Sequence, residues 1–273
     1  MSEKNNKYAI IVEYIGTSFS GSQFQPEQIT IQSEIERVIK ILTKEEIKTV
    51  FSGRTDSGVH AKCQFVHFYT DRELDKKRFI YSINAMLPSN ISVKQLMKVD
   101  KSFHSQKSAR FRWYRYIINN GQARSVFLKD LSTHIRDDLN LEEMQKALNY
   151  ISGCHDFTSF KKTNSDNPAK ECNLMYASCR KKSDIIYIDL IANRFLYNMV
   201  RIIVGTLIEI GKGVYKAERM LDVLKAKDRR QAGNTADPNG LILMRVGYDE
   251  KYNLNELMNM EATNEQNLLC KAS

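Results

Sequence analysis

The residues whose types are best suited to catalysis or binding lie in one short segment, FSGRTDSGVHA, at residues 51–61. Between its two glycines this segment holds a cation, Arg54, and a carboxylate, Asp56, and His60 follows closely. An aspartate before Ser-Gly commonly serves a turn, where its carboxylate accepts backbone N–H bonds. A carboxylate held at a loop tip beside a cation can also act as a nucleophile or a base. The segment alone leaves both interpretations open.

Two other kinds of site fit this segment poorly. Its glycines have the spacing of a phosphate-binding P-loop, but that motif continues with Lys and Ser or Thr, where Val59 and His60 stand. His60, Cys63 and His67 have the chemistry of zinc ligands. On a strand, however, His60 faces away from the other two because side chains alternate. We therefore expect no metal site here.

A second segment, RFRWYRY at residues 110–116, alternates cations with aromatic side chains. On a strand, Arg110, Arg112, Tyr114 and Tyr116 share one face. Such a face suits a surface that binds phosphates and stacks on bases. An amphipathic strand with half-buried aromatic rings and solvated arginines uses the same residues. Both interpretations remain open.

A third segment, ANRFLYNMVRIIVG at residues 192–205, has helical periodicity. Met199, Val200 and Ile203 belong to its apolar stripe, and Arg201 falls outside that stripe. A helical arginine off the apolar stripe is usually solvated. The alternative is that Arg201 pairs with a carboxylate across a cleft.

The elements that must position these residues are strands and helices that do not alternate strictly. This order favours an α+β sheet protein over a doubly wound parallel one. We predict an N-terminal half at residues 1–105, a C-terminal half at 106–250 and a tail at 251–273. The predicted strands cover residues 8–14, 48–52, 63–70, 110–118, 174–180, 185–192 and 241–248, and the predicted helices cover residues 31–42, 79–87, 141–151, 196–210 and 220–224.

Composition narrows the class of protein. The chain has 273 residues, a formal net charge of +9 and a pI near 9.2. A basic surface attracts polyanions, of which nucleic acid is the commonest. Five scattered cysteines without a CxxC pair are typical of reduced thiols in the cytoplasm. No apolar run approaches the ~18 residues of a membrane span, so we expect no membrane partner.

Taken together, these segments resemble the TruA family of tRNA pseudouridine synthases. The resemblance covers nearly residues 7–250, in the family's order. Its motifs are EYIGTSFSGSQFQ, GRTDSGVHA with QFVHF, INAMLP, VDKSFHS, YRYIIN, CHDFTSF, NRFLYNMVRIIVGTLIEIG and AKDRRQAGNTADPNGLIL. It implies a pseudouridine synthase fold with two α+β halves, a central, largely antiparallel sheet and an active-site cleft between the halves. It also implies a homodimer.

The same resemblance implies that the chain converts uridine into pseudouridine, at positions 38–40 of the tRNA anticodon stem-loop. The reaction conserves atoms, so we expect no cofactor and no metal. A stacked base is unreachable, so the nucleotide must be flipped into a pocket. Alternatives are a related enzyme that modifies another structured RNA such as rRNA, a catalytically silent RNA-binding protein, and a metal- or nucleotide-dependent enzyme.

By motif position, the resemblance assigns roles to individual residues. Asp56 is implied as the catalytic carboxylate, with attack on the sugar, attack on the ring and proton removal all open to it. Arg201 is implied to pair with Asp56, Tyr114 to stack on the base and take the C5 proton, and Arg54 to assist base flipping. The other expected substrate contacts are His60, Gln106, Arg110, Arg112, Lys161 and Lys162.

Four positions depart from the family's usual pattern. Ser22 stands where the family usually has tryptophan, and we expect it to remove an aromatic ring near the entrance of the site. Ile15 replaces a frequent acidic residue, Gln106 an arginine, and Asp237 a proline. Because the expected catalytic positions are intact, these departures bear on the choice of substrate and not on the chemistry.

Overall fold

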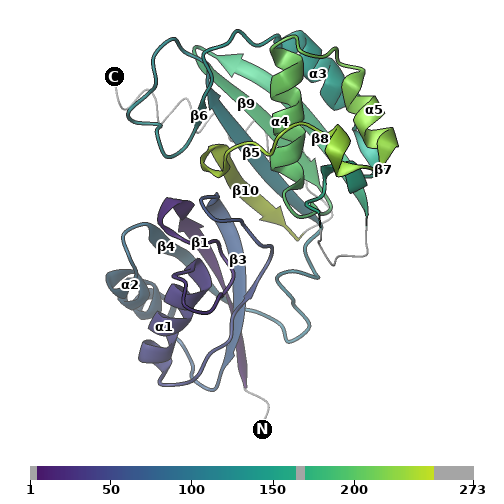
Figure 1. Cartoon of the computed structure of the whole chain (residues 1–273). Helices are drawn as coiled ribbons and strands as arrows, with labels where there is room; N and C mark the ends of the chain where they lie inside the picture. The colour runs from purple at the N-terminus through teal and green to yellow at the C-terminus, as the bar shows by residue number, and fades with distance from the viewer. Residues whose placement is uncertain (1–4, 164–169, 249–273) are drawn as a thin grey trace.

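One sheet of ten strands runs through the molecule in the computed structural model, which describes residues 5–163 and 170–248 (Figure 1). Its order is β4-β1-β3-β10-β5-β9-β8-β7, with β2 paired to β3 and β6 paired to β5. The strands are β1 (Asn6–Tyr14), β2 (Val50–Phe51), β3 (His60–Thr70), β4 (Ile91–Lys98), β5 (Phe111–Asn119), β6 (Thr133–His134), β7 (Gly153–Asp156), β8 (Glu171–Lys182), β9 (Ile185–Ala192) and β10 (Leu241–Gly247).

The pairing is antiparallel except between β10 and β3 and between β5 and β6. This confirms the expected α+β fold with a largely antiparallel sheet. β10 is the last described strand, yet it lies between β3 and β5 in the middle of the sheet. It therefore joins the strands of the two predicted halves, whose boundary near residue 105 stays a prediction.

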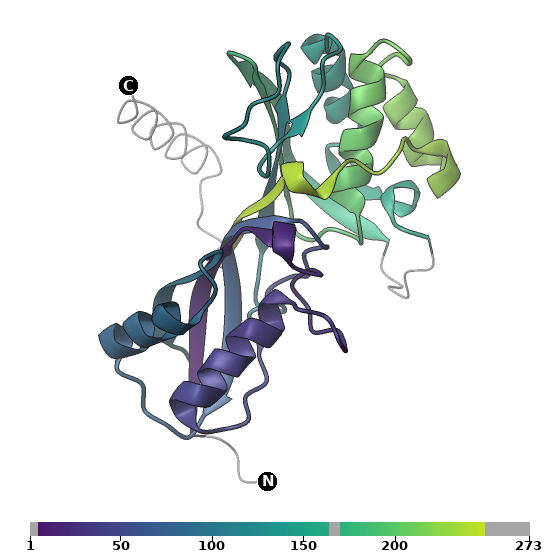
Figure 2. The same cartoon turned by 60° about the vertical axis from the view of Figure 1, so that its left-hand side comes forward.

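Helices cover the sheet in two groups (Figures 1 and 2). The helices α1 and α2 pack beside β1, β3 and β4, whereas α3, α4 and α5 pack beside β5, β8 and β9. One continuous apolar cluster includes side chains from both groups and from the strands beneath them. The helices are α1 (Ile31–Thr43), α2 (Lys76–Met86), α3 (Leu141–Tyr150), α4 (Met199–Gly211) and α5 (Arg219–Ala226).

Local sequence explains the elements nearest the site. Helix α1 begins after Thr30, whose side chain accepts from the Ser33 N–H while the Ser33 side chain caps the Thr30 N–H. In β5, Tyr114 and Tyr116 belong to the large core cluster, whereas Trp113 belongs to a second, small cluster on the opposite face. The alternation expected for this strand is therefore confirmed.

Among the boundaries that differ from the sequence prediction, two bear on the site. β3 begins at His60, so the strand starts three residues earlier than expected. Helix α4 begins at Met199 instead of Leu196, because Asn198 before it is in the left-handed conformation at φ 63°. Residues 194–198 are thus a separate connecting segment. Among the described residues, no helix has the length and apolarity needed to cross a membrane, and the predicted tail lies outside them.

Candidate active site

The glycine loop, residues 52–59, presents the Asp56 carboxylate without using it to form the turn. The Asp56 carbonyl accepts from the Val59 N–H at 3.1 Å, which closes the turn through the backbone. Gly58 takes a φ of +81° there, and a Cβ on it would lie 2.8 Å from the Pro238 ring. The turn interpretation therefore applies to the backbone of Asp56, and its carboxylate is left to face the cavity.

Thr55 anchors the loop to the segment that follows β1. Its N–H donates to the Ser22 Oγ at 2.8 Å, and its carbonyl accepts from the Ser22 N–H at 3.0 Å. Its hydroxyl lies 2.8 Å from the Tyr14 hydroxyl. Ser22 is 1% exposed and is not among the residues that line the cavity described below, so an effect of the missing ring on the entrance stays a prediction. The Ser22 hydroxyl binds the backbone of the glycine loop at Thr55.

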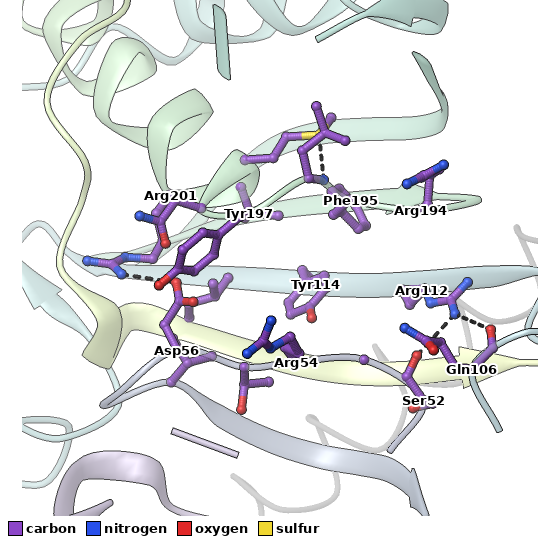
Figure 3. A pocket seen from close by; sticks show the side chains of 18 of the residues that line it. Ser52, Arg54, Asp56, Gln106, Arg112, Tyr114, Arg194, Phe195, Tyr197 and Arg201 are labelled. Carbon is purple, nitrogen blue, oxygen red and sulfur yellow. Dashed lines mark hydrogen bonds and ion pairs between the residues drawn. The ribbon is translucent and has the colours of Figure 1, made fainter. Parts of the chain in front are cut away.

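Arg201 reaches Asp56 from the first turn of α4. Its Nη1 donates to the Asp56 Oδ2 at 3.2 Å (Figure 3). Its Nε donates to the Ala236 carbonyl at 2.7 Å. Both side chains of the ion pair are mostly buried, at 16% and 18% exposure. The Ala236 carbonyl fixes the plane of the guanidinium, so Arg201 is a held partner of the carboxylate and not a solvated helix residue.

Burial and charge act on Asp56 in opposite directions. Burial raises the pKa of its carboxyl, while Arg201, Lys162 and Arg54 each lower it. Burial is the largest effect, and the pKa of Asp56 lies above its ordinary value. Arg201 lowers the pKa of Asp56, as expected for a partner that favours the ionised carboxylate. The structure adds that the cations offset the cost of burial only in part.

Tyr114 faces the same cavity from β5. It is 8% exposed, and its ring meets Phe195 edge to face at 5.2 Å between centroids. Burial raises the pKa of its hydroxyl, so the side chain is a neutral phenol at neutral pH. On the opposite face of β5, Arg115 forms a buried ion pair with Asp189 at 2.8 Å. The interpretation of β5 as a strand with solvated arginines therefore fails at Arg115, which is buried.

Arg112 lies on the cavity face of β5, but it binds main-chain carbonyls. Its Nη1 donates to Ala109 at 3.2 Å and to Asn193 at 2.8 Å. Its Nη2 donates to Ser52 at 3.1 Å and to Gln106 at 2.8 Å. These bonds use four of the five guanidinium N–H groups. The guanidinium thus links Ser52, Gln106, Ala109 and Asn193 at the wall of the cavity, and its expected contact with the substrate stays a prediction.

These residues enclose a cavity of about 730 Å³. Its wall combines the glycine loop, residues 106–109, β5 and residues 194–201 (Figure 3). Among the described residues that line it, Asp56 is the one acidic side chain, whereas Arg54, Lys107, Arg112, Arg194 and Arg201 are basic. The cavity is therefore suited to an anionic ligand.

Three further expected contacts lie at this cavity. Arg54 and Gln106 line it, and Arg54 is exposed. Lys162 lies at its edge, because its ammonium is 5.0 Å from the centre of the Tyr197 ring. Its backbone N–H also donates to the Tyr197 carbonyl at 3.0 Å. The structure thus brings Lys162 to the side of the cavity formed by residues 194–201.

Three other expected contacts do not line the cavity. His60 is buried, with its Nδ1 accepting from the Gly16 N–H at 3.0 Å and its Nε2 3.1 Å from the Asn239 carbonyl. Both ring nitrogens thus hold the fold together, which corrects the expectation that His60 binds substrate. Arg110 is exposed and Lys161 half-buried, both outside the cavity wall.

Sequence reasoning missed Lys107, Arg194 and Tyr197, all of which line the cavity. The predicted helix at residues 196–210 includes Tyr197 and begins two residues after Arg194, so helical periodicity gives neither residue a special position. A signal was present, because NRFLYN mixes cations with aromatic rings as RFRWYRY does. The left-handed residue Asn198, which separates this segment from the helix, has no comparable signature.

The fold and the cavity narrow the class of protein: a basic cavity with one mostly buried carboxylate in its wall suits a protein that binds an anionic ligand. Comparison with known families identifies the class further. The model of the tRNA pseudouridine synthase family matches residues 10–106 and 147–249. The chain belongs to this family.

Individual relatives agree with the family match. The chain is 41% identical to tRNA pseudouridine synthase A of Thermoanaerobacter sp. (strain X514) over 239 residues, which cover 88% of this chain and 98% of the relative. It is 41% identical to the protein of that name from Pseudoalteromonas atlantica over 251 residues, 92% of this chain and 95% of the relative. A chain of a solved Cbf5-Nop10-Gar1 complex aligns with 92% of this chain over 60% of its own length, at 10% identity and a TM-score of 0.32.

Proposed function

We propose that this chain is a tRNA pseudouridine synthase that isomerises uridine in the anticodon stem-loop, at positions 38–40. One observation supports this most strongly. The Asp56 carboxylate lies at the wall of a cationic cavity, 3.2 Å from Arg201, and Tyr114 lines the same cavity. The family match and the names of the relatives support tRNA as the substrate.

The reaction requires the bond from ribose C1′ to base N1 to break and a bond from C1′ to C5 to form. The proton on C5 is lost, and N1 gains one. In this proposal Asp56 acts as the carboxylate anion, and Tyr114 contacts the base and relays the C5 proton as a neutral phenol. The nucleotide must leave the helical stack to reach Asp56, and Arg54 on the glycine loop supports the flipped state.

Incubation of the purified protein with unmodified transcripts tests the choice of RNA. We expect pseudouridine in the anticodon arm of several tRNA transcripts, mapped to single nucleotides. Transcripts in which these uridines are replaced by cytidine are the matched control. If rRNA fragments react while the anticodon arms stay unmodified, the tRNA assignment is wrong, although the pseudouridine chemistry stands.

RNA binding should weaken steeply with salt. Arg54, Lys107, Arg194 and Lys162 surround the cavity, and each phosphate that a cation neutralises releases counterions. Four such contacts give a slope of roughly −3 to −4 for log K against log salt. Titrations of an inactive variant across a range of salt concentrations measure this slope. A flat plot would mean that phosphate contacts do not drive binding.

We further propose that the enzyme works as a homodimer in the cytoplasm. The compartment is supported by Cys154, Cys172 and Cys179, which form no disulfide in the part of the chain that the structure describes. The dimer rests on the family resemblance, and sedimentation of the purified protein tests it. A monomer at micromolar concentration would contradict it.

A further inference from the structure

Tyr197 has an unusual position among the aromatic side chains at the cavity. It is 48% exposed, whereas Tyr114 is 8% exposed and packs edge-on against Phe195. Its ring projects from the segment before α4 toward the glycine loop (Figure 3). Tyr197 therefore offers a ring face to a ligand in a place where Tyr114 has little surface left.

Two contacts with Lys162 and the conformation of Asn198 position Tyr197. Asn198 takes a left-handed conformation directly after it, which ends the connecting segment before α4. The Lys162 N–H donates to the Tyr197 carbonyl at 3.0 Å, and the Lys162 ammonium lies 5.0 Å from the ring centre. A cation at this distance from a ring face is attracted to it. The ring and the ammonium thus form one unit, here called the Tyr197–Lys162 pair.

The pair is also linked to the carboxylate. Lys162 lies near enough to Asp56 to lower the pKa of its carboxyl, together with Arg201 and Arg54. Lys162 is also exposed, so its ammonium faces solvent at the edge of the cavity as well as the carboxylate. An exposed tyrosine alone would need no explanation, but one that lines the cavity and carries a cation does.

We propose that the Tyr197–Lys162 pair is the outer wall of the nucleotide pocket. The Tyr197 ring stacks on the flipped uracil from the solvent side, and the Lys162 ammonium binds a phosphate next to that nucleotide. Aromatic stacking accepts any base, so the pair holds the nucleotide without reading its sequence. This inference rests on the proposed function and adds a positioning role for two residues of the same site.

Single-turnover assays on an unmodified tRNA transcript test the ring. Tyr197→Ala should lower kcat/KM roughly 10- to 100-fold, the loss usual when an aromatic platform is removed. Tyr197→Phe should stay within about threefold of wild type, because stacking needs the ring and not the hydroxyl. The matched control is Tyr215→Ala: Tyr215 is 43% exposed and carries Arg219 at 5.2 Å, but does not line the cavity.

Lys162 is tested by a readout that a purely structural role would not change. Lys162→Met should reduce the salt slope of tRNA binding by about one and should move the acid limb of the pH–rate profile upward. Equal thermal midpoints for all variants exclude a folding defect.

If wild type is inactive on every RNA, the proposed function fails. If wild type is active while Tyr197→Ala matches Tyr215→Ala, the ring has no role in binding the nucleotide. An unchanged salt slope in Lys162→Met would overturn the phosphate contact.

Discussion

Replacing Asp56 by asparagine should abolish pseudouridine formation and leave tRNA affinity within about twofold of wild type. Asparagine keeps the shape of the side chain and the backbone turn, in which the Asp56 carbonyl accepts from the Val59 N–H. It is neither a nucleophile nor a base, and such groups contribute about 100-fold or more to rate. Single-turnover rates and filter binding measure the two quantities. Residual turnover within tenfold of wild type would refute the catalytic role of Asp56.

A matched control separates this loss from a general effect of the substitution. Asp75 caps α2 by accepting from the Arg78 N–H at 2.8 Å and lies outside the cavity. Asparagine caps helices about as well as aspartate, so Asp75→Asn should keep both activity and stability. A defect of equal size in Asp75→Asn would mean that the assay reports folding and not catalysis.

Replacing Arg201 by alanine should lower turnover by roughly 10- to 100-fold, as expected for loss of a charge-assisted hydrogen bond of about 1.5–3 kcal/mol. It should also change the pH dependence. Burial already raises the pKa of Asp56, and Arg201 is the strongest of the effects that lower it. Without Arg201 the pKa of Asp56 rises further, so a smaller fraction of the carboxyl is ionised at any acidic pH. The acid limb of the rate profile should therefore move to higher pH.

Arg201→Lys is the informative companion. Lysine keeps the positive charge but cannot bind Asp56 and the Ala236 carbonyl with one rigid fork, as Arg201 does. Its acid limb should lie between those of wild type and Arg201→Ala. An unchanged profile in both variants would mean that the ion pair does not control Asp56.

The sequence alone predicts the position of a side chain where the pattern that places it is local. Two-residue alternation predicts that Arg112 and Tyr114 share a face of β5, and both line the cavity. Helical periodicity places Arg201 outside the apolar stripe of α4. The meeting of Arg201 with Asp56, 145 positions away, has no local signature, and it entered through the family resemblance.

The sequence does not predict the role of a side chain where that role depends on hydrogen-bond partners from distant segments. His60 and Arg112 have the right chemistry for substrate, but carbonyls and N–H groups from distant segments use their polar atoms. Ser22 stands where the family usually has an aromatic ring, and the sequence does not reveal that its hydroxyl binds the Thr55 backbone. The sequence does not reveal that Tyr197 lies outside α4, because the left-handed Asn198 that separates it from the helix has no sequence signature. Each of these facts depends on tertiary packing.

The central claim, that Asp56 drives the isomerisation of uridine in tRNA, is tested most directly with a tRNA transcript labelled with tritium at uridine C5. Isomerisation releases that hydrogen and leaves the nucleoside mass otherwise unchanged. We predict that wild type releases one tritium for each pseudouridine formed, while Asp56→Asn releases none although it binds the transcript. Tritium release without pseudouridine, or equal release by both proteins, would contradict the account.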